Sequence, residues 1–269
     1  MLHIYIVSLQ QDVEKRRVIS KTLEDYGLKF SFINAVYGKE LSEGVLSSIR
    51  AKSVGNVVRR GFSLTPGEIG CTLSHIMAYQ EILNKDLDWA CILEDDAILD
   101  ERFKDFINNF QTTGLNSESL YLLGGQNGFP GTHVVKSINN IKYIGGQKFT
   151  KVIRSERFIY RTCCYLISSS LAKSLIFLSK KSFILADDFD FLVKNKIINN
   201  IYLSNFVDHP LDLSESHLQK ERESAALNRN LIYHQKKNFF PLRVKNSIEW
   251  RLRLLILNTY KYVEKKDTI

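Results

Sequence analysis

The chain has 269 residues, 44% of them hydrophobic and 25% charged, which is typical of a soluble globular protein with one large or two small domains. Its net charge of +8 indicates an acidic partner, such as a phosphorylated ligand, an anionic membrane surface or nucleic acid. No apolar run approaches the ~18 residues of a membrane helix, and no secretory signal pattern opens the chain. The four cysteines lack metal-ligand spacing, so we expect reduced thiols in a cytosolic protein.

The N-terminal residues predict a β-α-β unit. Residues 2–9 are apolar and rich in β-forming side chains, as in a buried strand. Asp12 can cap the helix that follows, and Gly27 can end it. Residues 30–35 form a second strand, and this order of elements favours a parallel sheet.

A basic cluster of Lys15, Arg16 and Arg17 lies in the first turns of this helix. Cations in that position oppose the helix dipole, so their presence needs another reason. One reason is the solvation of a charged face. The other is a phosphate that binds near the end of the first strand.

We expect an irregular, mobile loop over residues 38–64, where glycine recurs. Loops of this length in a compact domain are more often functional than idle. Thr65, Pro66 and Glu68 then form the signature of a helix N-terminus with a capping box. This helix should extend to about Leu83.

Residues 89–93 are mostly apolar and are followed by three carboxylates, Glu94, Asp95 and Asp96. The apolar run predicts a buried strand, and three adjacent anions cannot be buried unpaired. Side chains alternate along a strand, so Glu94 and Asp96 point the same way and offer oxygen ligands to Mg²⁺ or Mn²⁺. The alternative is a strand that runs into an acidic surface turn.

A second carboxylate cluster, Asp187 and Asp188, follows the strand-like residues 184–186. The helix dipole favours acidic residues at a helix start, which explains them without any function. They can also supply a general base. The other expected elements are a helix capped by Asp100, strands over residues 120–123, 158–167 and 197–203, hairpins or a flap over 126–150, and a helix capped by residues 168–170.

The C-terminal residues differ in composition, which divides the chain into a domain of residues 1–235 and a tail of residues 236–269. Basic side chains in the tail alternate with Trp250 and leucines, as in a basic amphipathic helix. Such a helix either lies on an anionic membrane or packs on the core of the domain.

Four sequence blocks occur in a characteristic order: Val7-Ser8-Leu9 followed by Lys15-Arg16; Gly67-Glu68-Ile69-Gly70-Cys71-Thr72-Leu73-Ser74-His75; Ile92-Leu93-Glu94-Asp95-Asp96; and Tyr165-Leu166-Ile167-Ser168 followed by Ala186-Asp187-Asp188. Together they resemble glycosyltransferase family 25, the lipopolysaccharide and lipooligosaccharide β-galactosyltransferases of Gram-negative bacteria. The resemblance covers about residues 2–215. It implies a GT-A-like α/β catalytic domain over residues 1–235, in which helices flank a Rossmann-type, mostly parallel sheet.

The resemblance also implies a UDP-sugar donor, usually UDP-galactose, and inversion at the anomeric carbon. Glu94-Asp95-Asp96 matches the metal-binding Asp-x-Asp motif of such enzymes, so we expect Glu94 and Asp96 to bind Mn²⁺ or Mg²⁺. The expected donor-binding residues are Ser8, Leu9, Arg16, Glu94 and Asp95, and the expected acceptor-binding residues are Ser74 and His75. The catalytic base is expected to be Asp188, with Asp187 and then Glu68 as the alternatives.

A lipid-linked oligosaccharide acceptor would explain the basic, aromatic tail, and would place the enzyme peripherally on the cytoplasmic face of the bacterial inner membrane. Three alternatives stay open. The donor can be UDP-glucose or a UDP-N-acetylhexosamine, or the chain can be an inactive paralogue that binds sugar nucleotide. The net charge also allows a nucleic-acid binding protein, but no nucleic-acid reading motif is present, so we expect no such partner.

Overall fold

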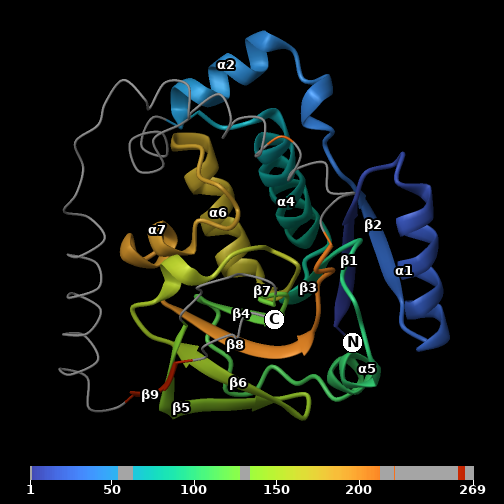
Figure 1. The fold of residues 1–269 in the computed structure, drawn as a ribbon, viewed down its shortest axis with the longest axis vertical. Helices are drawn as coiled ribbons and strands as arrows, with labels where there is room; N and C mark the ends of the chain where they lie inside the picture. Colours follow the sequence, from blue (N-terminus) through green and yellow to red (C-terminus); the bar gives the residue numbers. More distant parts are fainter. Residues whose placement is uncertain (1, 54–62, 128–133, 213–220, 222–259, 264–269) are drawn as a thin grey trace.

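The computed structural model describes residues 2–53, 63–127, 134–212, 221 and 260–263 (Figure 1). Its strands are β1 (His3–Ser8), β2 (Phe30–Asn34), β3 (Trp89–Glu94), β4 (Ser119–Gly124), β5 (Val135–Ile144), β6 (Gln147–Val152), β7 (Cys164–Ser168), β8 (Asn200–Val207) and β9 (Tyr260–Val263). Its α-helices are α1 (Val13–Asp25), α2 (Glu43–Lys52), α4 (Pro66–Asn84), α5 (Glu101–Asn108), α6 (Ser169–Lys181) and α7 (Phe189–Lys194). Within the described ranges, no helix is both long and apolar enough to cross a bilayer.

The described strands form one sheet in the order β2-β1-β3-β7-β4-β8-β6-β5-β9. Strand β1 pairs in parallel with β2 and β3, and β4 pairs in parallel with β8. Strand β7 lies antiparallel between β3 and β4, and the pairs that involve β5 or β6 are antiparallel as well. The predicted α/β class is confirmed, but the sheet is mixed, with parallel pairing confined to β2-β1-β3 and β4-β8.

Helices cover both faces of the sheet. Alternate residues of its strands pack in two separate cores, one on each face. Tyr5 and Val7 of β1 pack in one core with residues of α4, α6 and α7. Ile4 and Ile6 pack in the other core with residues of α1 and α5. Figure 1 shows α4 and α6 side by side, with α1 on the far side of β1 and β2. The fold is therefore a three-layer α/β/α sandwich.

The predicted β-α-β unit is confirmed. Gly27 follows α1 with a φ of +69°, and the N–H of Leu28 donates to the carbonyl of Leu23 at 2.9 Å, which closes the helix end. The parallel register pairs Ser8 with Asn34 and Val7 with Glu94. The carboxyl ends of β1, β2 and β3 therefore lie at one edge of the sheet.

The predicted capping box at the start of α4 is also confirmed. The N–H of Glu68 donates to Thr65 Oγ1 at 3.2 Å, and the N–H of Thr65 donates to Glu68 Oε2 at 3.0 Å. Both residues are buried. The two bonds satisfy backbone donors that would otherwise lose their water, so they stabilise the N-terminus of α4.

Replacing Thr65 with alanine should lower the free energy of unfolding by about 1 kcal/mol, because the Glu68 N–H loses its acceptor. Urea denaturation of both proteins measures the difference. Thr65→Ser keeps the hydroxyl and serves as the matched control. A Thr65→Ala variant as stable as Thr65→Ser would contradict the role of the cap.

Three predicted elements differ in the structure. Residues 43–52 of the expected loop form α2, which Ser42 caps by accepting from the N–H of Val45 at 3.4 Å; residues 54–62 lie outside the described ranges. The strand expected over 158–167 begins at Cys164, because Glu156–Phe158 is a 3₁₀ turn and Arg161 has a φ of +67°. The strand expected over 197–203 is β8, shifted to Asn200–Val207.

The predicted helical tail is corrected where the structure describes it. Tyr260–Val263 is strand β9, which pairs antiparallel with β5. The rest of the predicted tail, and with it the proposed boundary at residue 235, lies outside the described residues.

Candidate active site

The carboxyl ends of β3 and β8 bring together Glu94, Asp96 and His209. The residues that follow the two strands are joined by a bridge, in which the Ile98 N–H donates to the Asp208 carbonyl at 2.9 Å and the reverse bond is 3.0 Å. Potential ligand atoms of Glu94, Asp96 and His209 all lie within 4.8 Å of one another. The structure thus groups the two predicted metal ligands and adds a histidine that the sequence analysis did not predict.

The charges in this cluster suit a cation. His209 Nε2 lies 3.4 Å from Asp96 Oδ2, and its Nδ1 lies 2.8 Å from the carbonyl oxygen of Pro210. Burial alone would raise the pKa of Asp96, but the hydrogen bond and charge of His209, with the charges of Lys15 and Arg161, together lower that pKa. Asp96 Oδ1 is buried and has no hydrogen-bond partner among the described residues. Two carboxylates and an imidazole, with one buried oxygen unused, fit a divalent metal ion.

Asp95 points to the end of β1 instead. Ser8 and Lys15 lie near its side chain and influence its charge. Burial raises the pKa of Asp95 to about 6, and Ser8 and the Lys15 charge oppose this rise. The predicted metal pair and Asp95 therefore diverge, as alternation along a strand requires.

Arg16 holds the end of β1 in place. Its Nε donates to Ser8 Oγ at 3.1 Å and to the Leu9 carbonyl at 3.0 Å, and Nη2 donates to the Ser8 carbonyl at 2.7 Å and to Asn34 Oδ1 at 2.8 Å. The guanidinium also lies 4.5 Å from the ring centroid of Phe32. The predicted donor-binding residues Ser8, Leu9, Arg16 and Asp95 thus form one group, in which Arg16 already has internal hydrogen bonds. Their contact with a donor stays a prediction.

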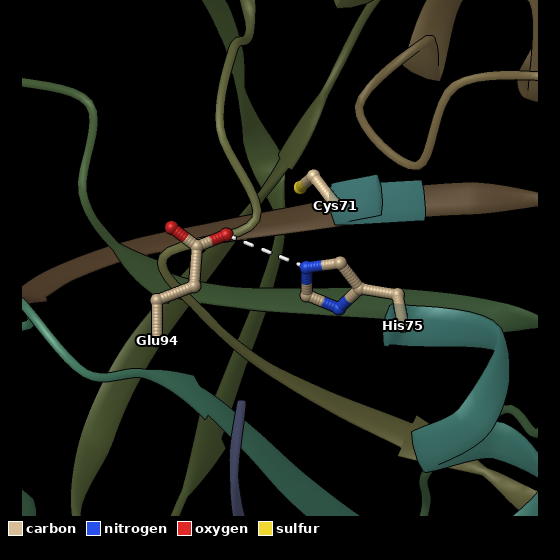
Figure 2. A group of neighbouring side chains, drawn as sticks. All are labelled: Cys71, His75 and Glu94. Carbon is tan, nitrogen blue, oxygen red and sulfur yellow. Dashed lines mark ion pairs between the residues drawn. The ribbon is translucent and has the colours of Figure 1, made fainter. Parts of the chain in front are cut away.

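Glu94 contacts the predicted acceptor residue His75 (Figure 2). His75 Nε2 lies 3.4 Å from Glu94 Oε1, and the hydroxyl of Thr162 donates to the same oxygen at 2.5 Å. His75 is fully buried, and its Nδ1 lies 2.8 Å from the hydroxyl of Tyr165. His75 therefore lies in the protein interior, next to the Glu94 carboxylate.

Ser74, the other predicted acceptor residue, has its hydrogen-bond partners elsewhere. Its hydroxyl donates to the Gly70 carbonyl at 2.6 Å and accepts from the N–H of Val36 at 2.8 Å. It is buried, and these two bonds tie α4 to the segment after β2. An acceptor-binding role for Ser74 and His75 stays a prediction.

The candidate bases occupy two places. Glu68 is buried in the capping box, 1% exposed. Asp188 is the N-cap of α7, where its Oδ1 accepts from the N–H of Phe191 at 3.2 Å. The N–H of Ala186 donates to Thr72 Oγ1 at 3.3 Å, so the loop with Asp187 and Asp188 is fastened to α4 between the turns that carry Glu68 and His75.

An open cleft adjoins the cluster of Glu94, Asp96 and His209 at the ends of β4 and β8. Asn127 Nδ2 donates to Asp208 Oδ1 at 3.1 Å, next to His209, and Arg161 Nη1 donates to the carbonyl of Asn127 at 3.0 Å. The Arg161 charge also lowers the pKa of Asp96, after the larger effects of His209 and Lys15. The cleft is lined by Gly124, Gly125, Gln126, Asn127, Val134, Lys136, Leu203, Ser204, Asn205, Val207 and Asp208.

Comparison with known proteins agrees with the sequence blocks. A family model described as "Glycosyltransferase family 25 (LPS biosynthesis protein)" matches residues 1–190. The lipooligosaccharide biosynthesis protein lex-1 of Haemophilus influenzae is 23% identical over 97% of this chain and 91% of its own length. Procollagen galactosyltransferase 1-A of Xenopus laevis is 27% identical over 44% of this chain, and the match spans only 20% of that protein.

A solved structure, that of a glycosyltransferase involved in the glycosylation of the major capsid of PBCV-1, aligns with 82% of this chain and 98% of its own. The TM-score is 0.42 and the identity is 10%.

Proposed function

Because this chain belongs to glycosyltransferase family 25, we propose that it transfers galactose from UDP-galactose to a lipooligosaccharide acceptor, with inversion at the anomeric carbon and with the help of a divalent metal ion. The observation that carries this proposal is the cluster of Glu94, Asp96 and His209 at the carboxyl edge of the sheet, beside an open cleft. Open α/β sheets bind their ligands at this edge.

The names of the two relatives support the acceptor and the sugar separately. The lex-1 protein, which matches nearly the whole chain, is named for lipooligosaccharide biosynthesis. The procollagen enzyme is named a galactosyltransferase, and it matches less than half of the chain. The lipooligosaccharide acceptor therefore has the broader support.

The residues present fit a metal-assisted transfer. Glu94, Asp96 and His209 would hold Mn²⁺ or Mg²⁺, which when bound would neutralise charge on the diphosphate leaving group. The group of Ser8, Leu9, Arg16 and Asp95 lies at the same edge of the sheet, where it would contact the donor. Asp188 would accept the proton of the acceptor hydroxyl as the new glycosidic bond forms.

A donor screen tests the function. The purified full-length chain, a lipooligosaccharide acceptor and Mn²⁺ are incubated with UDP-galactose, UDP-glucose or UDP-N-acetylhexosamines, and products are analysed by mass spectrometry and by NMR for the linkage. We expect a hexose to be added from UDP-galactose with inverted configuration. Transfer from another UDP-sugar alone would correct the donor, and the absence of transfer from every donor would contradict the proposal.

We further propose that the tail binds anionic membrane, which would bring the enzyme to a lipid-linked acceptor at the cytoplasmic face of the inner membrane. The support is its sequence, in which cationic residues alternate with Trp250 and leucines.

The full-length chain should therefore co-sediment with anionic vesicles, and less so as the salt concentration rises, because salt screens the attraction. Replacing Arg251 and Arg253 with glutamate should weaken this binding, whereas replacing Lys21 and Lys29, which lie in the domain, should not. Equal binding by both charge-reversal variants would show that the tail is not the contact.

A further inference from the structure

Cys71, His75 and Glu94 form a second cluster that the proposed transfer reaction does not use in full. Cys71 and His75 are four residues apart on α4, so their side chains lie on one face of the helix. Glu94 approaches them from the end of β3, and Figure 2 shows the three side chains converging. Ligand atoms of all three lie within 4.8 Å of one another.

His75 Nδ1 lies 2.8 Å from the hydroxyl of Tyr165, and that hydroxyl lies 3.0 Å from Tyr79 Oη. When the Tyr165 hydroxyl donates to Tyr79, it can accept from the Nδ1–H of His75, and Nε2 of the neutral imidazole then carries a lone pair. That lone pair faces Glu94 Oε1 at 3.4 Å.

The Nε2 atom of His75 is buried without a hydrogen bond. The side chain is 0% exposed, and no described residue is a hydrogen-bond partner of Nε2. A metal ion between Nε2 and Glu94 Oε1 would satisfy both atoms.

The third member of the cluster adds a sulfur ligand. A thiolate, an imidazole and a carboxylate are together the ligands of Zn²⁺ and similar ions. Tyr165 fixes the ring orientation of His75, as the hydrogen-bond partner of a metal-binding histidine usually does. Cys71 is partly exposed, which gives an ion a route from solvent.

We propose that Cys71, His75 and Glu94 bind a soft divalent transition-metal ion, with Zn²⁺ as the best fit. The Cys71 thiol loses its proton to solvent as the metal–sulfur bond forms. This site differs from the cluster of Glu94, Asp96 and His209 because it contains sulfur, but the two share Glu94. An ion at the sulfur site therefore competes with Mn²⁺ or Mg²⁺ for this carboxylate.

Co²⁺ is the probe for the test, because a cobalt–thiolate bond produces a charge-transfer absorption band that nitrogen and oxygen ligands do not give. Titration of the full-length, reduced chain with Co²⁺ should produce this band, and equimolar Zn²⁺ should remove it. Cys71→Ser should abolish the band. Cys91→Ser, which changes a buried thiol on β3 outside the cluster, and Asp96→Asn, which changes only the other cluster, should retain it.

A second measurement uses the wild-type chain, so it does not depend on whether Cys71→Ser folds. In the wild-type chain, Zn²⁺ should slow the alkylation of Cys71 at least tenfold, followed by peptide mass spectrometry, while excess Mn²⁺ should not. Absence of the cobalt band, its persistence in Cys71→Ser, or unchanged alkylation with Zn²⁺ would each overturn the proposal. These readouts need no sugar transfer, so they stand apart from the test of the proposed function.

Discussion

Asp96→Asn should lower the rate of sugar transfer by at least about 100-fold and leave the fold intact, in line with the loss of a major electrostatic stabiliser. Asparagine keeps the size of the side chain and removes its charge. The variant therefore loses an anionic metal ligand and the partner that raises the pKa of His209 against the opposing effect of burial. The cluster would then hold a divalent cation with only one carboxylate.

The measurement is turnover of UDP-sugar at saturating donor, with circular dichroism to confirm the fold. Asp100→Asn is the matched control, because Asp100 is an exposed helix cap and asparagine caps a helix equally well. Excess EDTA should abolish activity of the wild-type enzyme, and added Mn²⁺ should restore it. Full activity of Asp96→Asn, or of the wild type in EDTA, would exclude the proposed role of the cluster.

Asp188→Asn should abolish transfer while the affinity for UDP is retained, and Asp187→Asn should be less damaging. An inverting reaction needs a base on the face of the sugar away from UDP, and an amide cannot accept the proton. The structure makes this substitution informative. The amide oxygen of asparagine can still accept from the N–H of Phe191, so α7 keeps its cap and a loss of activity reports on chemistry.

Isothermal titration with UDP and a transfer assay on the same preparations separate binding from chemistry. Glu68→Gln is the matched control, because glutamine can keep the bond to the Thr65 N–H. If Asp188→Asn turns over normally and Glu68→Gln is inactive but equally stable, Glu68 is the base. The capping box would then be only part of its role.

Local signals predicted much of this fold. The β-α-β unit, the Thr65 capping box and the Ser168 cap of α6 all follow from residues a few positions apart, and all are present. The shared direction of Glu94 and Asp96 follows from alternation along one strand. Helix α2 escaped prediction because Gly44 lies in its first turn and Leu46 is its single buried residue, which leaves little periodicity to detect.

Contacts that depend on the strand order could not be predicted. His209 reaches Asp96 because β8 lies in the same sheet and its end is bridged to Ile98. Nothing in the sequence around His209 indicates that neighbour. Arg161 is a similar case, because its position beside the cleft depends on a backbone φ of +67° that few non-glycine residues adopt.

The position of β7 also bears on how the chain is made. Among the described strands, β3 has β1 on one side and β7, which begins at Cys164, on the other. During synthesis, this edge of β3 therefore stays unpaired until the residues of β7, far downstream, have left the ribosome. Unpaired edges invite association with other chains, and such distant pairing is slow. A nascent chain that stalls before Ser168 would hold its first three strands with an apolar edge exposed, so the early part of the sheet depends on the late part for protection.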